Sequence, residues 1–262
     1  MAEGEGFADW MSKLSETFTT GPLSHIAIPG SHDAMAYSLD MDSQVLEPDF
    51  LKTMDCIFCG CLRCIIKKWS ITQEAMIELK TWLGQHSKEV VILAFSHFKE
   101  MSAEQHTNLI KFLKEHFQAK ICPDNGMLSL KDCWESGYQV ILSYDNRNVE
   151  DPVLWPGIEY WWANNSDPTE VISSLDNKKQ SGRPKGLFAA GLNLTFYGCN
   201  IFWNLTSSLK EKTMTAYSLL LDWVKKQHPG SDEQSINIIA ADFVGLNSFA
   251  HDIIQLNTAK TS

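Results

Sequence analysis

Apolar residues along the chain fall into short continuous runs that alternate with stretches of helical periodicity. The short runs are typical of parallel strands that are buried on both faces. Six such strands are predicted, at about residues 24–29, 89–95, 138–144, 157–162, 185–194 and 235–242. Apolar positions three and four apart predict helices over about residues 7–20, 70–86, 103–117, 168–180, 208–227 and 247–256. This alternation of strands and helices indicates an α/β architecture built on parallel strands.

Length and charge narrow the class of protein. The chain has 262 residues, of which 44% are hydrophobic, and this is enough for a sizeable core. Its formal net charge of −10 argues against a nucleic-acid partner, because phosphate backbones attract basic surfaces. No apolar run approaches the ~18 residues of a transmembrane segment. The first residues, Met1 to Gly6, carry neither a basic nor an apolar stretch, so a cytoplasmic location is expected.

The seven cysteines are an odd number in a chain without a recognisable signal peptide, which favours reduced thiols. Four of them lie close together, at Cys56, Cys59, Cys61 and Cys64. A single patch lacks the second, separated pair of ligands that structural zinc sites usually have. Buried or half-exposed thiols are therefore the preferred interpretation, with zinc binding or acylation as alternatives. No metal or cofactor is assigned from the sequence.

One strand end combines groups that can carry acid–base chemistry. The apolar run 26–28 is followed by Pro29-Gly30, which predicts that the strand stops there, and then by Ser31, His32 and Asp33. A histidine beside a carboxylate can act as an acid–base pair, because imidazole titrates near neutral pH and needs a partner to fix its tautomer. The alternative is a capped turn, in which Ser31 or Asp33 bonds a free backbone N–H.

Residues 26–33 resemble the first catalytic box of the phosphatidylinositol-specific phospholipase C (PI-PLC) X domain, Pro-Gly-(Ser/Thr)-His-(Asp/Asn) at the end of the first barrel strand. Other segments match in order: Ala8-Asp-Trp-Met11, Lys68-Trp-Ser-Ile-Thr-Gln73, Glu89-Val-Val-Ile-Leu93, Leu154-Trp-Pro-Gly157 and Asn237-Ile-Ile-Ala-Ala-Asp-Phe243. The resemblance to the small PI-PLC X domain-containing proteins covers about residues 7–258. It implies one domain over residues 1–262 with a TIM-barrel-like (β/α) fold.

The chain departs from the family pattern between Gln73 and Glu74. In the family, the segment that ends at Gln73 begins a helix that leads to a strand ending in Asp-Leu-Arg. A further strand then ends in the second catalytic histidine. Here the tail of a later helix follows Gln73 directly, so the second and third barrel strands are predicted to be absent and two helices to be joined. An incomplete barrel of about six strands is expected, as a spliced or truncated form would give.

The resemblance also implies roles for particular residues. The family reaction is phosphoryl transfer on phosphatidylinositol, in which the inositol 2-hydroxyl attacks phosphorus and diacylglycerol leaves. His32 would be the base, and Asp242 would stabilise its imidazolium. Asp33 would work with the second catalytic histidine of the family as the acid. Asn193 and Thr195 would bind inositol hydroxyls. From the residues alone, Asp242 could instead cap a helix.

Alternatives stay open for other residues near these positions. Asn193 and Thr195 could merely satisfy a loop. Trp161 and Trp162 fit either the rim of the site or the core. His97, after the strand at 89–95, could reach the mouth of the barrel or be a loop residue without a proton-transfer role.

The second histidine and the arginine that binds phosphate have no matching position in the sequence. Loss of a general acid typically costs ~10²–10⁴-fold in rate, and loss of the cation costs more. Removal of two strands would also leave unpaired sheet edges. The sequence therefore predicts a phosphodiesterase of the PI-PLC type with little or no lipase activity and doubtful stability. The alternative is an inactive isoform that binds lipid or headgroup, or competes with the active enzyme.

Overall fold

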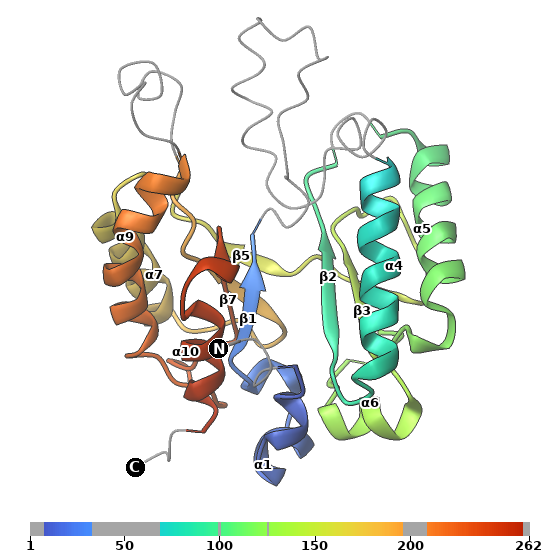
Figure 1. The fold of residues 1–262 in the computed structure, drawn as a ribbon, viewed down its shortest axis with the longest axis horizontal. Coiled ribbons are helices and arrows are strands. Elements are labelled where there is room, and N and C mark those ends of the chain that lie inside the picture. Colours follow the sequence, from blue (N-terminus) through green and yellow to red (C-terminus); the bar gives the residue numbers. More distant parts are fainter. Residues whose placement is uncertain (1–7, 33–68, 99–100, 125, 196–208, 259–262) are drawn as a thin grey trace, which may run out of the picture. The chain divides into compact units, whose positions relative to one another are not determined.

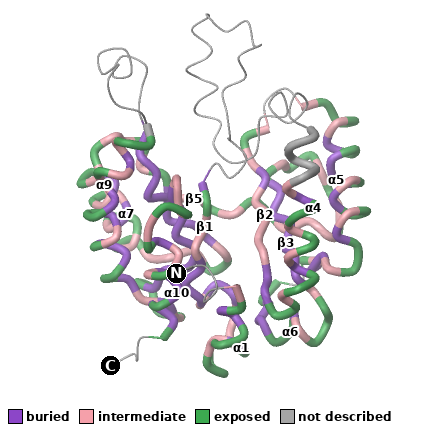
Figure 2. The backbone as a smooth tube through the Cα atoms, in the orientation of Figure 1, coloured by how far each residue is buried: buried purple, intermediate pink, exposed green. Residues whose placement is uncertain are grey.

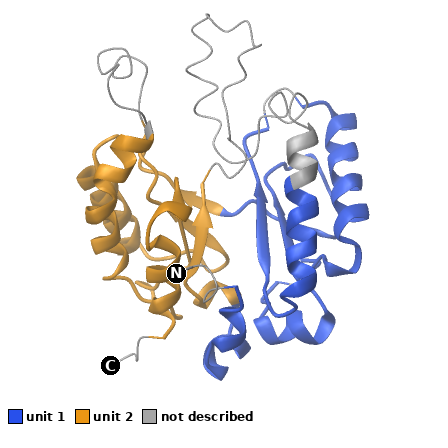
Figure 3. Ribbon diagram, in the orientation of Figure 1, with its two compact units in different colours: residues 1–22, 34–39, 56–158 blue, residues 23–33, 40–55, 159–262 orange. Residues whose placement is uncertain are grey.

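A computed structural model describes residues 8–32, 69–98, 101–124, 126–195 and 209–258 of the chain, with side chains from residue 75 in α4 and from residue 210 in α9 (Figure 1). The chain divides into two compact units (Figure 3). Unit 1 contains residues 1–22, 34–39 and 56–158, and unit 2 contains residues 23–33, 40–55 and 159–262. Each unit has its own parallel sheet and its own hydrophobic core.

Unit 2 holds a four-stranded parallel sheet in the order β1-β7-β6-β5. Its strands are β1 (Ile28–Ser31), β5 (Glu159–Trp161), β6 (Phe188–Gly191) and β7 (Ile238–Ala241). Its helices are α7 (Pro168–Gln180), α9 (Leu209–Val224) and α10 (Phe249–Leu256), with short 3₁₀ turns η2 (Leu23–His25) before β1 and η4 (Val244–Leu246) after β7.

The core of unit 2 lies between one face of this sheet and the three helices. Phe188 and Ala190 of β6 pack in it with Val171 of α7, Trp223 of α9 and Ile253 of α10. Side chains along a strand alternate between faces, so the intervening residues of each strand point to the opposite face. All residues of β6 and β7 are nevertheless buried, as the purple strands of Figure 2 show, so both faces are covered.

Unit 1 holds a three-stranded parallel sheet in the order β2-β3-β4. The strands are β2 (Val91–Phe95), β3 (Val140–Tyr144) and β4 (Leu154–Trp155). Its helices are α1 (Glu16–Thr20), α4 (Trp69–Gln85), α5 (Ala103–Phe117) and α6 (Leu130–Ser136), with 3₁₀ turns η1 (Met11–Lys13) and η3 (Gln118–Lys120). Leu83 of α4 and Leu113 of α5 pack against Val140 and Leu142 of β3 to form its core.

The helices predicted at 103–117 and 168–180 are confirmed as α5 and α7. Both carry clear start signals. Ser102 caps α5 in a reciprocal pair with Gln105, and Asp167 accepts a hydrogen bond from the Thr169 backbone N–H at the start of α7.

The predicted bounds of the first strand are wrong. Residues 23–25 form η2, and β1 continues through Pro29 and Gly30 to Ser31. Pro29 fits because β1 pairs on one side only among the described strands. The backbone N–H of Ile28 donates to the carbonyl of Asn237, just before β7, and that of His32 donates to Ala241 of β7, and the same alternation turns the Pro29 nitrogen away from β7.

Three other elements differ from the prediction. The helix expected at 7–20 is interrupted at Leu14, whose backbone is extended, so η1 and α1 are separate. The strands number seven in the described residues rather than six, because β4 at Leu154–Trp155 was missed. Helix α6 was also missed, although Ser129 caps its start and Gly137 ends it with φ of +74°.

The region around the predicted deletion has two features of interest. Helix α4 runs without a break through Gln73 and Glu74. Among the described strands, β1 pairs only with β7 and β2 pairs only with β3, so the strands on either side of the predicted deletion are both edge strands in the described residues. Asp33 and the cysteines at 56–64 lie outside the described residues.

Candidate active site

One face of the unit 2 sheet gathers the polar residues that follow its strands. Gly30 of β1 lies against Ile238 and Ala240 of β7 on the face away from the helices. Two residues further along each strand, the same face carries His32 and Asp242. Carboxyl ends of parallel strands are where α/β barrels hold their active sites.

His32 and Asp242 are in contact, as the sequence predicted. His32 Nδ1 lies 2.6 Å from Asp242 Oδ1, and both side chains are largely buried, at 3% and 13% exposed. An ionised carboxylate only accepts hydrogen bonds, so Nδ1 carries the proton of the neutral imidazole and the lone pair is on Nε2. Such an imidazole can take a proton at Nε2 while Asp242 stabilises the imidazolium. The interpretation of Asp242 as a helix cap is not needed, because its Oδ1 is held by His32.

The backbone around Asp242 is held in an unusual conformation. Phe243, the next residue, has φ of +56° and ψ of +32°, which only a few per cent of non-glycine residues adopt. The Tyr217 hydroxyl, from α9, donates to the Asp242 backbone carbonyl. Burial raises the pKa of Tyr217 to about 12, so its hydroxyl keeps its proton and remains a donor. Tyr217 therefore helps to hold the turn that aims the Asp242 carboxylate at His32.

Two buried asparagines fix the segment that leads into β1. Asn237 donates from Nδ2 to the carbonyls of Leu23 and Ile26, at 2.9 and 2.8 Å. Asn257, just after α10, bonds both backbone groups of Ala27, at 2.8 and 2.9 Å. These bonds satisfy backbone groups of the segment just before β1. They therefore set the position of β1 and of His32, which follows it.

The carboxyl ends of β5 and β6 supply the second half of the site. Leu192 and Leu194 face the helical core, so Asn193 and Thr195 point to the opposite side. The Tyr160 hydroxyl donates to Asn193 Oδ1 at 2.7 Å, and Trp162 Nε1 donates to Thr195 Oγ1 at 2.9 Å. The Tyr160 ring also stacks on the His32 imidazole, with centroids 5.9 Å apart.

These contacts connect His32, Asp242 and Asn193 within unit 2, and in the same unit Trp162 separately holds Thr195. Sequence reasoning missed Tyr160, because Tyr160, Trp161 and Trp162 form an unbroken aromatic run that does not indicate which side chain faces the core. Trp161 is 2% exposed and packs on Phe188 in the core, whereas Trp162 is 42% exposed. The two alternatives for this tryptophan pair therefore each hold for one of them.

The described part of unit 2 has no second histidine at a strand end. Its other histidines are His25 in η2, His228 before β7 and His251 in α10. The sequence has three arginines, Arg63, Arg147 and Arg183. Arg183 is the one in the described part of unit 2, and its guanidinium donates to the carbonyls of Ser24 and Gly230, at the amino ends of the strands.

Unit 1 also contains titratable side chains that are buried or that follow a strand. Glu89 precedes the amino end of β2, and burial raises its pKa to about 7. His106 Nδ1 lies 2.6 Å from the Tyr144 hydroxyl, and its Nε2 lies 2.9 Å from Asn146 Nδ2, so both ring nitrogens are engaged within the protein. His97, after β2, is exposed and contacts the Ser96 hydroxyl at 2.9 Å.

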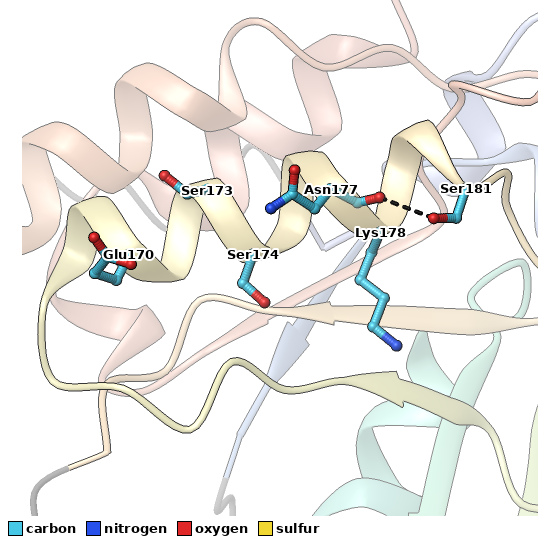
Figure 4. Close-up of a pocket in the computed structure, with 6 residues that line it drawn as sticks. All are labelled: Glu170, Ser173, Ser174, Asn177, Lys178 and Ser181. Carbon is cyan, nitrogen blue, oxygen red and sulfur yellow. Dashed lines mark hydrogen bonds between the residues drawn. The ribbon is translucent and has the colours of Figure 1, made fainter.

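A hollow of about 470 Å³ lies along α7 and does not include the site residues. Its lining is Glu170, Ser173, Ser174, Asn177, Lys178 and Ser181, all on one side of the helix (Figure 4). Val171 and Leu175 of the same helix face the core, so the hollow belongs to the outer surface. In the described residues there is no cluster of three metal-binding side chains, and no helix is long and apolar enough to cross a membrane.

The chain is similar in sequence to known proteins over nearly its whole length. No protein-family model matches the chain. PI-PLC X domain-containing protein 1 of Danio rerio is 41% identical over 302 residues, which cover 98% of this chain and 97% of the relative. The human protein of that name is 32% identical and covers 95% of this chain and 92% of itself. PI-PLC X domain-containing protein 3 of Danio rerio is 31% identical, with coverage of 98% and 97%.

Solved structures show the same fold. Phosphatidylinositol-specific phospholipase C from Listeria monocytogenes is similar with a TM-score of 0.59 and 16% identity, over 95% of this chain and 98% of that one. A variant of the enzyme of that name from Staphylococcus aureus gives a TM-score of 0.61 and 13% identity, over 95% and 97%. The TIM-barrel-like α/β fold predicted from the sequence is thereby confirmed, and the described residues supply seven parallel strands where a closed barrel has eight.

Proposed function

Because the chain belongs to the PI-PLC X domain-containing protein family, we propose that it is a phosphoric diester hydrolase of the phosphatidylinositol-specific phospholipase C type. The observation that carries the proposal is the 2.6 Å contact between His32 Nδ1 and Asp242 Oδ1. With the proton of the neutral imidazole on Nδ1, Nε2 is the ring nitrogen that takes a proton, at the edge of the sheet where barrel enzymes hold their active sites.

In the proposed reaction, His32 Nε2 takes the proton of the inositol 2-hydroxyl while the oxygen attacks phosphorus. The bond from phosphorus to the diacylglycerol oxygen breaks, that oxygen receives a proton, and a cyclic inositol phosphate forms. Asp242 stabilises the imidazolium through the Nδ1 proton. Asn193 and Thr195 bind ring hydroxyls beside His32. The resemblance assigns Asp33 to work with a second histidine as the acid, and because that histidine has no match in this sequence, the leaving oxygen takes its proton from water.

Turnover by this chain is proposed to be slow. The reaction needs a cation at the phosphate oxygens and an acid at the leaving group. The arginine in the described part of unit 2 is held at the other end of the sheet, by Ser24 and Gly230. His32 and Asp242 supply only the base, so the rate is expected to fall below that of a complete site by more than the roughly 10²–10⁴-fold that a missing acid alone costs.

A deletion between Gln73 and Glu74 accounts for the missing groups. Ninety-eight per cent of 262 residues is about 257 residues, so an alignment over 302 positions leaves about 45 positions of the zebrafish relative opposite gaps. Among the described strands the outer edges of β1 and β2 have no partner, and this, together with the continuous helix α4, also supports the absence of two strands between them. We propose one family domain over residues 1–262 from which the second and third barrel strands have been removed.

The proposed substrate is phosphatidylinositol or a related phospholipid at a membrane surface. Two large apolar side chains follow the strand ends of unit 2, Trp162 at 42% exposed and Leu246 at 53%. Tryptophan is favoured where a protein meets the lipid headgroups. These residues support contact with a lipid surface through apolar side chains, and the proposed location of that contact is the cytoplasm.

The second candidate is an inactive headgroup binder, and the donors around Asn193 favour it because they do not depend on the missing acid. The test is inositol phosphate release from phosphatidylinositol vesicles by purified protein, with the Listeria monocytogenes enzyme as positive control. Slow release that His32→Ala abolishes supports the hydrolase. Release that is equal to buffer, together with co-sedimentation on phosphatidylinositol vesicles but not on phosphatidylcholine vesicles, supports the binder.

A further inference from the structure

Tyr160 contacts both halves of the candidate site. It is the middle residue of β5 and lies on the face away from the helical core, since its neighbour Trp161 packs in that core. Its ring stacks on His32 with an interplanar angle of 24° and a centroid distance of 5.9 Å. Its hydroxyl donates to Asn193 Oδ1 at 2.7 Å.

The hydrogen bond from Tyr160 fixes which end of the Asn193 carboxamide remains for a ligand. Oδ1 is engaged by Tyr160, whereas Nδ2 has no hydrogen-bond partner among the described residues. Asn193 is 1% exposed, so water does not freely satisfy that amino group. A buried donor without an acceptor costs free energy that an acceptor atom of a ligand would recover.

A missing side chain makes room for this bond. A Cβ on Gly191 would lie 2.5 Å from the Tyr160 hydroxyl and 2.6 Å from Asn193 Oδ1, which are both closer than real Cβ atoms come. Gly191 has an ordinary strand conformation, so the glycine is needed for space and not for φ.

A second pair repeats the arrangement two residues further along. Trp162 Nε1 donates to Thr195 Oγ1 at 2.9 Å. A hydroxyl that accepts one hydrogen bond still has its own proton to donate. Asn193 and Thr195 are thus both held by donors from the β5 segment, and both are left with a donor of their own.

We propose that Tyr160 is a positioning residue that couples the His32 imidazole to the Asn193 carboxamide, and that it turns the Asn193 amino group toward an acceptor oxygen of a ring hydroxyl. This inference rests on the proposed function, since it takes the inositol headgroup as the ligand. It adds that the Asn193 side of the site recognises hydroxyl oxygens as acceptors.

The first experiment measures binding of myo-inositol to purified protein by ligand-observed NMR titration. Tyr160→Phe keeps the ring on His32 and removes only the hydroxyl, so affinity should fall about tenfold, the effect of one lost hydrogen bond. Asn193→Ala should fall by at least as much. The double variant should be no weaker than Asn193→Ala, because Tyr160 acts through Asn193. Independent, multiplied losses, or an unchanged affinity in Tyr160→Phe, would overturn the proposal.

Tyr144→Phe is the matched control. It removes a hydroxyl that contacts His106 Nδ1 at 2.6 Å in unit 1, and it should leave myo-inositol affinity unchanged. Inorganic phosphate, which has no ring hydroxyl, should bind wild type and Tyr160→Phe alike. A loss confined to phosphate would assign the Asn193 donor to phosphate oxygens and overturn the ring-hydroxyl assignment.

A measurement without ligand separates this inference from the proposed function. In ¹⁵N-labelled protein, Tyr160→Phe should shift the side-chain amide resonances of Asn193, and Tyr160→Leu should in addition shift the ring signals of His32. If these shifts occur but wild type binds no myo-inositol, the positioning role stands and the headgroup assignment fails. If neither set of signals moves, the positioning role is overturned.

Discussion

Glu89 should make the stability of the protein depend on pH in a direction opposite to that of most carboxylates. It is 2% exposed, and Oε1 accepts a hydrogen bond from the Met11 backbone N–H at 2.9 Å. Burial raises its pKa from 4.5 to about 7, with Asp9 acting in the same direction and His86 and Lys13 against it. Each unit of pKa is worth about 1.4 kcal/mol, so the full shift corresponds to about 3 kcal/mol.

The sign follows from proton binding in the two states. The folded protein binds the Glu89 proton more tightly than the unfolded chain, so the stabilisation is complete below about pH 4.5 and is lost as pH rises through about 7. Glu89→Gln cannot ionise and can still accept from Met11. The variant should therefore gain on wild type by about 2–3 kcal/mol in unfolding free energy between pH 5 and pH 8.

The assay is urea unfolding of wild type and Glu89→Gln at matched pH values from 5 to 8.5. The difference between the two proteins isolates residue 89, because the other titrating groups, including the Asp9–His86 pair at 2.9 Å, are common to both. A difference that stays constant with pH would refute the reasoning. A variant less stable than wild type at pH 8 would show that the ionised carboxylate is favourable there.

Three further substitutions test the supports of the site. Asn237→Ala leaves three buried backbone groups without their partner and should lower the unfolding free energy by about 2–4 kcal/mol in urea titrations; a loss below about 0.5 kcal/mol would contradict this. Tyr217→Phe frees the Asp242 carbonyl and should lower kcat about tenfold with little change in KM in vesicle assays, whereas a change in KM alone would speak against it. Gly191→Ala forces Tyr160 away and should weaken myo-inositol binding about tenfold or more with an unchanged circular dichroism spectrum; full affinity would show that the space is not needed.

The resemblance named His32 and Asp242 as partners, and their convergence could be expected because it depends only on topology. Both residues follow apolar runs that read as buried strands, and carboxyl ends of parallel strands meet at one edge. Their separation of 210 positions in sequence does not matter once β1 and β7 pair. The actual bounds of β1 could not be predicted from Pro29-Gly30, because proline is a strand breaker in the interior of a sheet but not at an edge.

The role of Tyr160 was harder to see because Tyr160, Trp161 and Trp162 form a continuous aromatic run. Such a run gives no indication of which side chain faces the helices. Only the pairing of β5 with β6 assigns Trp161 to the core and turns Tyr160 to Asn193. Helix α6 was missed for a related reason, because its seven residues are too few to show a period, although both of its ends carry cap residues.

The central claim is that His32 and Asp242 act as one catalytic unit on phosphatidylinositol. The most direct measurement is inositol phosphate release by wild type, His32→Ala, Asp242→Asn and the double variant, each checked for folding by its unfolding transition. We expect the rate of inositol phosphate release to fall about 10²-fold or more in each single variant, or to the uncatalysed rate if wild type is slow. The rate of the double variant should be no lower than that of the slower single variant. Release by wild type that neither substitution changes, or losses that multiply in the double variant, would contradict the claim.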